Sequence, residues 1–316
     1  MRNIDGLKVL DATIRDGGLV NDFFFTDDFV KAVYEANVAA GIDYMEMGYR
    51  ADKKMFDPSK FGKWKFASDD DIRSIVGENR TSLKLSVMAD VGRCDFRNDI
   101  HPKSESPLDL IRVATYIETI PEAVEMIEYA CSQGYEATCN IMAISKCTMT
   151  QLSEALDILK KTPVMGVYIV DSYGALYPKE IRQLTRLFYD KLSPFGKLTG
   201  IHTHNNQLCA FANTIESRDA GACLLDGTAY GMGRGAGNCH MEGLLGYLNG
   251  QKYHVEPILD LVRDQMLPLK EQGVEWGYNT SYLITGLTNV HPRDAIGATK
   301  AKDTDYREQF RYHSYE

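Results

Sequence analysis

Short apolar runs alternate along the chain with longer segments whose apolar residues recur every three or four positions. The short runs lie at residues 8–13, 44–48, 84–89, 110–114, 137–143, 167–170, 198–203 and 223–229. The longer segments include residues 27–40, 121–133, 150–160, 178–191 and 208–220. Because buried strands are short and apolar whereas surface helices are amphipathic, this alternation predicts an α/β protein with parallel strands joined by helices.

The ends of the predicted helices carry residues typical of helix boundaries. Thr26 and Thr150 stand at predicted starts, and Gly41, Gly134 and Gly221 follow predicted ends. Threonine caps the first turn of a helix, and glycine adopts the left-handed conformation that often ends one. Eight such strand–helix units predict a closed (β/α)8 TIM barrel, with an open doubly wound sheet as the alternative.

The alternation changes at about residue 250, where residues 257–272 and 280–286 read as helices without intervening strands. We therefore expect a catalytic barrel at residues 1–250. A small C-terminal helical extension and tail, residues 251–316, is expected near the barrel mouth. Long loops at residues 49–68 and 94–107 follow the second and third predicted strands, at the end where such barrels bind substrate.

Composition narrows the class of protein. A formal net charge of −9 argues against binding to nucleic acid or to an anionic membrane surface. No apolar stretch approaches the ~18 residues of a membrane span. The seven cysteines form no C-x-x-C pair, which suits free thiols in a reducing compartment. The first residues also lack the apolar core of a signal peptide. We therefore expect a cytoplasmic protein.

Candidate chemistry begins with the segment GIHTHNN at residues 200–206. Residues two apart on a strand face the same way, so His202 and His204 would point into the barrel together. Neutral imidazoles bind divalent metals. A hydrogen-bonded pair of core histidines is the alternative, but their shared face at the carboxyl end of a strand favours metal ligands.

Two further motifs lie on neighbouring strand ends. In DATIRDGG, residues 11–18, the charged pair Arg15 and Asp16 meets a glycine turn and needs partners unless it is solvated. In GMGRGAGN, residues 231–238, the glycines allow the backbone to approach a ligand closely. This segment loosely resembles a dinucleotide-binding fingerprint. It follows the last strand instead of opening the first β-α-β unit, so we discount that interpretation.

Barrel closure places the eighth strand between the seventh and the first. Asp16, His202, His204 and the amide of Asn238 could then meet at one cation. Such mixed nitrogen and oxygen donors favour Mn²⁺, with Mg²⁺, Co²⁺ or Zn²⁺ also compatible, over a thiolate-bound structural zinc. Arg15 would lie beside the metal, able to bind a carboxylate or to stabilise an enolate oxygen.

These motifs resemble those of the metallolyase superfamily of TIM barrels, which includes 3-hydroxy-3-methylglutaryl-CoA lyase and isopropylmalate synthase. The similarity is greatest to 4-hydroxy-2-oxovalerate aldolase and extends over nearly the whole chain. It is carried by DATIRDG at residues 11–17, IRVAT at 111–115, VDSYGA at 170–175, GMG at 231–233 and GYNTSY at 277–282.

The resemblance implies a role for each matching residue. Asp16, His202 and His204 would be the metal ligands, and Asn238 matches an asparagine that binds metal in some relatives. Arg15 would stabilise the enolate, and Tyr282 would lie near the reacting hydroxyl. The remaining candidates for catalysis or substrate binding are Glu46, Arg112, Ser145 and Tyr173. For Glu46 and Arg112, membership of an ion network in the barrel core is an equal alternative.

One position departs from the aldolase pattern. The aldolase has a catalytic histidine three residues after the metal-binding aspartate, and Leu19 occupies that position here. A leucine cannot transfer a proton. Tyr116 also replaces a second histidine. The general base is therefore open, with Asn21, Asp22, Tyr116 and Tyr173 as candidates.

The resemblance implies a class II, metal-dependent aldolase or lyase that acts on a 2-oxo acid through a pyruvate enolate. A Claisen-type synthase that condenses an acyl-CoA with a 2-oxo acid is the first alternative. A barrel that has lost its chemistry and binds a ligand is the second. An amidohydrolase is disfavoured, because its His-x-His belongs on the first strand. The resemblance also implies an aldehyde dehydrogenase partner, and a homodimer is compatible with the sequence.

Overall fold

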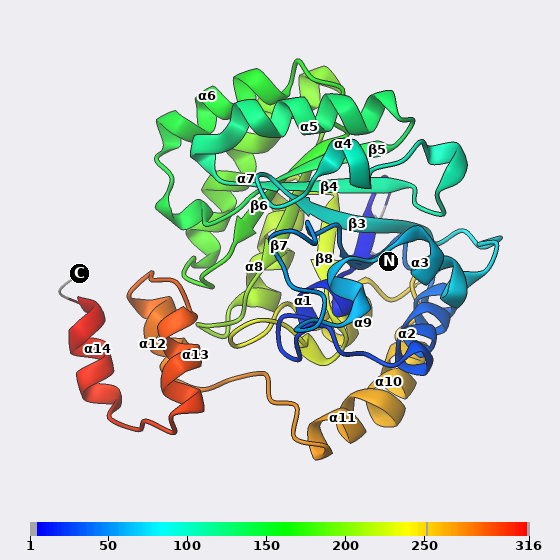
Figure 1. Cartoon of the computed structure of the whole chain (residues 1–316). Helices are drawn as coiled ribbons and strands as arrows, with labels where there is room; N and C mark the ends of the chain where they lie inside the picture. The colour runs from blue at the N-terminus through cyan, green and yellow to red at the C-terminus, as the bar shows by residue number, and fades with distance from the viewer. Residues whose placement is uncertain (1–4, 251, 315–316) are drawn as a thin grey trace.

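The computed structural model describes residues 5–250 and 252–314. Its centre is a closed barrel of parallel strands in which each strand pairs with the next and β8 pairs with β1 (Figure 1). The strands are β1 (Lys8–Asp11), β2 (Tyr44–Tyr49), β3 (Lys84–Asp90), β4 (Leu110–Thr115), β5 (Glu136–Ile141), β6 (Gly166–Asp171), β7 (Leu198–Thr203) and β8 (Leu224–Gly227). The predicted (β/α)8 barrel is confirmed.

Helices follow the strands and surround the barrel (Figure 1). The longer ones are α2 (Asp27–Ala40), α3 (Asp69–Val76), α5 (Ile120–Ser132), α6 (Met149–Leu159), α7 (Pro178–Leu192) and α8 (Ala210–Ala220). Shorter helices α1 (Thr13–Gly17), α4 (Phe96–Asp99) and α9 (Met241–Leu248) follow β1, β3 and β8. The chain then continues through α10 (Glu256–Leu261), α11 (Leu267–Glu271), α12 (Thr280–Leu287), α13 (Arg293–Lys300) and α14 (Tyr306–Ser314).

The helix boundaries follow local chemistry. The Thr26 hydroxyl accepts a hydrogen bond from the Phe29 N–H at 3.2 Å, which caps α2 as expected. Gly41 ends α2 in the left-handed conformation at φ 73°. The start predicted at Thr150 was two residues late, because Thr148 and Gln151 form the reciprocal capping box that opens α6.

The first strand ends earlier than the prediction. β1 stops at Asp11, and residues 13–17 turn into the short helix α1. The Thr13 hydroxyl donates to Asp11 Oδ2 at 2.6 Å and accepts from the Ala229 N–H at 2.8 Å, which joins this turn to the chain after β8. Arg15 and Asp16 therefore project from a helical turn above the barrel and not from the strand itself.

The barrel interior is unusually polar at its centre. All residues of β2, β4 and β6 are buried, as expected for strands covered on both faces. Among them, the fully buried guanidinium of Arg112 lies 4.5 Å from the ring centroid of Tyr168. A charge at this depth requires partners, and the ion pairs described below supply them.

The C-terminal helices contact the loops at the carboxyl ends of the strands. The amide of Asn206, after β7, donates to the Thr285 hydroxyl on α12 at 3.3 Å. The Ser145 hydroxyl, after β5, donates to Asn289 Oδ1 at 2.7 Å. Helix α10 packs against α2 on another side of the barrel (Figure 1). Across the part of the chain that the structure describes, no helix has the length and apolar character needed to cross a bilayer.

We expect Gly41→Ala to destabilise the protein more than Gly196→Ala. Both glycines have left-handed backbones, at φ 73° and 67°, so the conformational cost of about 1–2 kcal/mol is shared. A Cβ at Gly41 would overlap the carbonyl oxygen of Lys252, whereas nothing lies within 4 Å of one at Gly196. Thermal unfolding of the two variants measures the difference, and equal midpoints would contradict the packing around α2.

Candidate metal centre

A carboxylate and two imidazoles meet at the carboxyl end of the barrel. The Asp16 Oδ2 atom lies 3.5 Å from His202 Nε2 and 3.9 Å from His204 Nε2. All three side chains are buried, and their candidate ligand atoms lie within 4.8 Å of one another. The structure thus brings together the three residues that the sequence predicted as a cluster.

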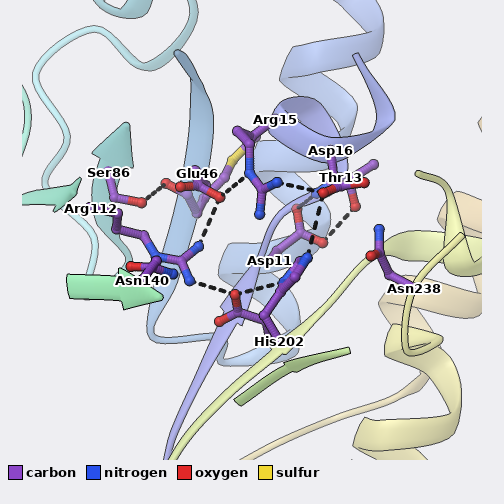
Figure 2. A network of polar contacts seen from close by, with 12 residues as sticks. Asp11, Thr13, Arg15, Asp16, Glu46, Ser86, Arg112, Asn140, His202 and Asn238 are labelled. Carbon is purple, nitrogen blue, oxygen red and sulfur yellow. Dashed lines mark hydrogen bonds and ion pairs between the residues drawn. The ribbon is translucent and has the colours of Figure 1, made fainter. Parts of the chain in front are cut away.

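Asn238 approaches the same cluster from the loop after β8 (Figure 2). Its Nδ2 donates to the Met232 carbonyl at 3.3 Å, while its Oδ1 is buried without a hydrogen-bond partner. A Cβ at Gly233 would overlap Asn238 and crowd Asp16 Oδ1, so glycine is needed for this approach. His202 Nε2 is a second buried atom without a partner. Unpaired buried acceptors beside a carboxylate fit a divalent cation.

Each histidine is held through its other ring nitrogen. His202 Nδ1 lies 2.9 Å from Asp226 Oδ2, and His204 Nδ1 lies 3.3 Å from the carbonyl oxygen of Arg234. With Nδ1 protonated and donating, each ring presents Nε2 to the cluster. Such contacts fix the orientation of imidazole ligands in metal sites.

Charged side chains link the cluster to the barrel core (Figure 2). Arg15 pairs with Asp16, and its Nε donates to Glu46 Oε2 at 2.7 Å. Arg112 donates to the same Glu46 oxygen at 2.8 Å and to Asp226 Oδ2 at 2.5 Å. The network holds three carboxylates and two guanidiniums. Its formal charge is −1, which a cation at the cluster would offset.

The surrounding charges set the protonation of the cluster. Burial alone would raise the pKa of Asp16, but the charge of Arg15, followed by the contacts of the two histidines, holds that pKa well below its usual value. Burial likewise acts against ionised Asp226, and Arg112 outweighs it to lower that pKa. Burial lowers the pKa of His204 to about 3. Burial acts against a charged His202, but its contacts with Asp16 and Asp226 outweigh burial and raise that pKa. At neutral pH the cluster therefore offers an ionised Asp16 and a neutral His204, the forms that bind metal, while His202 must release any proton it holds when a metal binds.

One cavity adjoins the cluster, and a second lies beyond it. The inner one, of about 50 Å³, is lined by Arg15, Asp16, Leu19, Tyr49, Met88, Ala114, Asn140, Met142, Val170, Ser172, His202, His204 and Arg234. The outer one, of about 600 Å³, lies among residues 19–22, residues 233–235 and the C-terminal segments 270–282 and 296–300. Leu19 and Arg234 line both cavities and therefore mark the boundary between them.

The other predicted site residues lie outside the inner cavity. Glu46 and Arg112 belong to the buried network, and neither lines the inner cavity. Tyr282 lines the outer cavity instead.

Ser145 and Tyr173 contact the C-terminal part of the chain. Ser145 bonds to Asn289, and the ring of Tyr173 packs edge-on against His291 with centroids 5.6 Å apart. The catalytic and substrate-binding roles given to these residues and to Tyr282, Glu46 and Arg112 stay predictions.

Sequence reasoning missed Asp226, Tyr49 and Arg234. Asp226 was within a predicted apolar strand, where a lone carboxylate is itself an indication of a buried partner. Tyr49 ends β2 and lines the inner cavity. Arg234 was noted only as part of a glycine-rich loop, and no local pattern distinguishes its side chain from a solvated one.

Fold and site together define a (β/α)8 barrel with a candidate Asp-His-His metal centre at the carboxyl ends of its strands. Residues 6–265 match the HMGL-like family model, and the chain belongs to that family. Aldolases and lyases of this family depend on a divalent metal.

Relatives with assigned activities are moderately similar. The chain is 30% identical over 279 residues to an oxaloacetate decarboxylase of Mycobacterium tuberculosis, covering 82% of this chain and 76% of the relative. It is 28% identical over 268 residues to a 4-hydroxy-2-oxovalerate aldolase of Bacillus cereus, covering 85% and 76%.

Solved structures share the fold. The N-terminal domain of a candidate aldolase from Bacteroides vulgatus superposes with a TM-score of 0.78 at 27% identity, covering 93% of this chain and 97% of that domain. The HMG-CoA lyase of Brucella melitensis superposes with a TM-score of 0.67 at 14% identity, covering 84% and 99%. This second likeness concerns the fold alone.

We expect Asp226→Asn to lower the affinity for Mn²⁺ or Co²⁺ by about 10–100-fold, because the carboxylate that orients His202 is lost. Competition with a chelating dye measures the affinity. Asp157→Asn is the control, since that carboxylate is partly exposed and pairs with Lys160 and Lys191 on the surface. Unchanged affinity in a folded Asp226→Asn variant would show that this contact does not support the site.

Proposed function

We propose that the protein is a divalent-metal-dependent carbon–carbon lyase that cleaves a 2-oxo acid and leaves the pyruvate fragment as its enolate. The observation that carries this proposal is the convergence of Asp16, His202 and His204 on the cavity that Arg15 also lines. These three residues, with Asn238, would hold the metal. When bound, it would supply Lewis-acid stabilisation of negative charge on oxygen.

Arg15 supports the same chemistry from the protein side. Its guanidinium is fixed by Asp16 and Glu46, so it faces the inner cavity without a need to reorganise. An arginine carries five N–H groups, so donors remain for a substrate oxygen after these two contacts. A fixed cation beside the reacting oxygen stabilises charge that develops there.

The inner cavity lacks an evident proton acceptor. Apart from the candidate ligands, the titratable side chains that line it are Arg15, Tyr49 and Arg234. Burial raises the pKa of Tyr49, so its hydroxyl stays protonated at neutral pH. Leu19 occupies the position of the histidine that serves the aldolase pattern. None of these groups accepts a proton at neutral pH.

The lack of a proton acceptor in the inner cavity affects which substrates the site can cleave. Aldol cleavage of a 4-hydroxy-2-oxo acid requires removal of the hydroxyl proton as the carbon–carbon bond breaks. Loss of CO2 from a 2-oxo acid with a carboxylate on C3 requires none, because the bond electrons pass directly into the enolate. A proton donor then completes pyruvate, and Tyr49 is placed to serve. Decarboxylation is therefore a second candidate beside aldol cleavage, and the similarity to an oxaloacetate decarboxylase supports it.

The proposal extends to the C-terminal extension, residues 251–316. Tyr282 would contact the part of the substrate that enters the outer cavity, which that extension helps to form. A Claisen-type condensing synthase and a binding role without chemistry are the remaining alternatives. Thiol release from acetyl-CoA with 2-oxo acids would indicate the first, and absence of stoichiometric metal the second.

Enolate formation is tested directly with pyruvate. Because the inner cavity supplies no base of its own, the buffer must supply one, such as imidazole. We expect protein stripped of metal and reloaded with Mn²⁺ or Co²⁺ to speed the exchange of pyruvate methyl protons for deuterium in that buffer, as measured by mass spectrometry. Asp16→Asn should lose about 100-fold or more of this rate, while Asp157→Asn should retain it. Failure of the reloaded protein to exchange pyruvate protons would count against enolate chemistry.

Leu19→His separates the two substrate classes. A histidine at the boundary of the inner cavity would supply the missing base, so we expect cleavage of 4-hydroxy-2-oxovalerate to rise about tenfold or more. Decarboxylation of oxaloacetate, corrected for the metal-only rate, should stay unchanged. Leu19→Asn is the matched control, since it has polarity without a base of suitable pKa. Efficient aldol cleavage by the unaltered protein, with no gain in Leu19→His, would place the base elsewhere and remove the argument for decarboxylation.

A further inference from the structure

Arg234 lies where the inner and outer cavities meet, on the loop after β8. Its main chain is tied to the candidate metal centre. The N–H donates to Asp16 Oδ1 at 3.0 Å, and the carbonyl oxygen lies 3.3 Å from His204 Nδ1. The backbone at this position is therefore fixed relative to the cluster, and the side chain extends from a fixed point.

In the described part of the chain, the guanidinium of Arg234 has no anionic partner. Its Nη2 donates to the Ser172 carbonyl at 3.0 Å, and its Nε is buried without a hydrogen-bond partner. No carboxylate of residues 5–250 or 252–314 forms an ion pair with it, in contrast to Arg15 and Arg112, which are each paired with two carboxylates.

The charge of Arg234 affects the pKa of a neighbouring histidine. Burial, followed by the charge of Arg234, lowers the pKa of His291 to about 4, so this imidazole is neutral at neutral pH. Tyr173, which packs against His291, also stays neutral because burial raises its pKa. A partly buried cation without a carboxylate partner is stabilised by an anion that enters with a ligand.

The outer cavity has room for such a ligand. Its volume of about 600 Å³ falls within the range of small-molecule sites. This volume exceeds what the two-carbon aldehyde released from 4-hydroxy-2-oxovalerate would fill. Lys270 and Lys300 also border this cavity. The Nζ of Lys270 donates to the Trp276 carbonyl at 2.9 Å and lies over that indole ring. Arg234 is the cation that adjoins both the inner cavity and this larger space.

We propose, on the basis of the proposed function, that the substrate is a 2-oxo acid with a second carboxylate at its far end, and that Arg234 binds this carboxylate. The outer cavity then holds the part of the substrate that lies beyond its 2-oxo and C1 carboxylate groups. The planar guanidinium can donate to both carboxylate oxygens at once, which a lysine at this position could not match. Arg234 is thus a specificity-determining residue.

Equilibrium binding tests the proposal without turnover. Calorimetry on the Mn²⁺-loaded protein compares 2-oxoglutarate and 2-oxoadipate with 2-oxopentanoate and 2-oxohexanoate, which match them in chain length but lack the second carboxylate. We expect at least one dicarboxylate to bind about tenfold or more tightly than its partner. Arg234→Met should abolish this preference, and Arg234→Lys should restore part of it.

The controls separate Arg234 from the rest of the site. Arg234→Met keeps the main-chain contacts to Asp16 and His204, so its Mn²⁺ affinity reports whether the metal centre is intact. Arg182→Met, which removes a surface cation paired with Glu216, should keep the preference.

Three outcomes overturn the assignment: no preference in the unaltered protein, loss of the preference in Lys300→Met instead of Arg234→Met, or tighter binding of a phosphonate analogue than of the dicarboxylate. If pyruvate still binds and exchanges its methyl protons in these cases, the proposed lyase function stands while the role of Arg234 falls. If neither pyruvate nor any 2-oxo acid binds, both fall.

Discussion

The buried chain of ion pairs from Asp16 through Arg15, Glu46 and Arg112 to Asp226 is the interaction on which the candidate site depends. Asp226, at the far end of these ion pairs, contacts His202, and His202 in turn lies beside Asp16. Both ends of the series of ion pairs therefore lie at the cluster. Because every member is buried, removal of one would leave others unpaired at considerable cost. The same contacts that stabilise the barrel centre therefore hold the candidate ligands in place.

The sequence predicted the barrel because each strand and helix has a local pattern, and it predicted Asp16, His202 and His204 because their motifs stand at strand ends. It missed α1 because hydrogen bonds of Thr13 to both Asp11 and the distant Ala229 turn the chain out of β1. Pairings such as Arg112 with Asp226, 114 residues apart, have no local pattern. The location of Tyr282 depends on how α12 packs, which the sequence does not specify.

Family membership and substrate chemistry are separable in this chain. The HMGL-like match covers the barrel and the motifs of the cluster, whereas the two relatives named above carry different activities. The two proposed reactions both pass through an enolate and differ in whether a proton must first be removed. Leu19 lies at the boundary of the inner cavity, where the proposed base would act. On that proposal, the side chains around the cavity decide which of the two reactions the metal centre supports.

The two parts of Arg234 do different work, because its peptide groups orient Asp16 and His204 while its guanidinium faces the cavities. Any amino acid except proline would provide the same peptide N–H and carbonyl. With the ligand role proposed for Arg234, a substitution there would alter ligand preference while the metal centre stays in place. Such a position would let one scaffold diversify among metabolites during evolution.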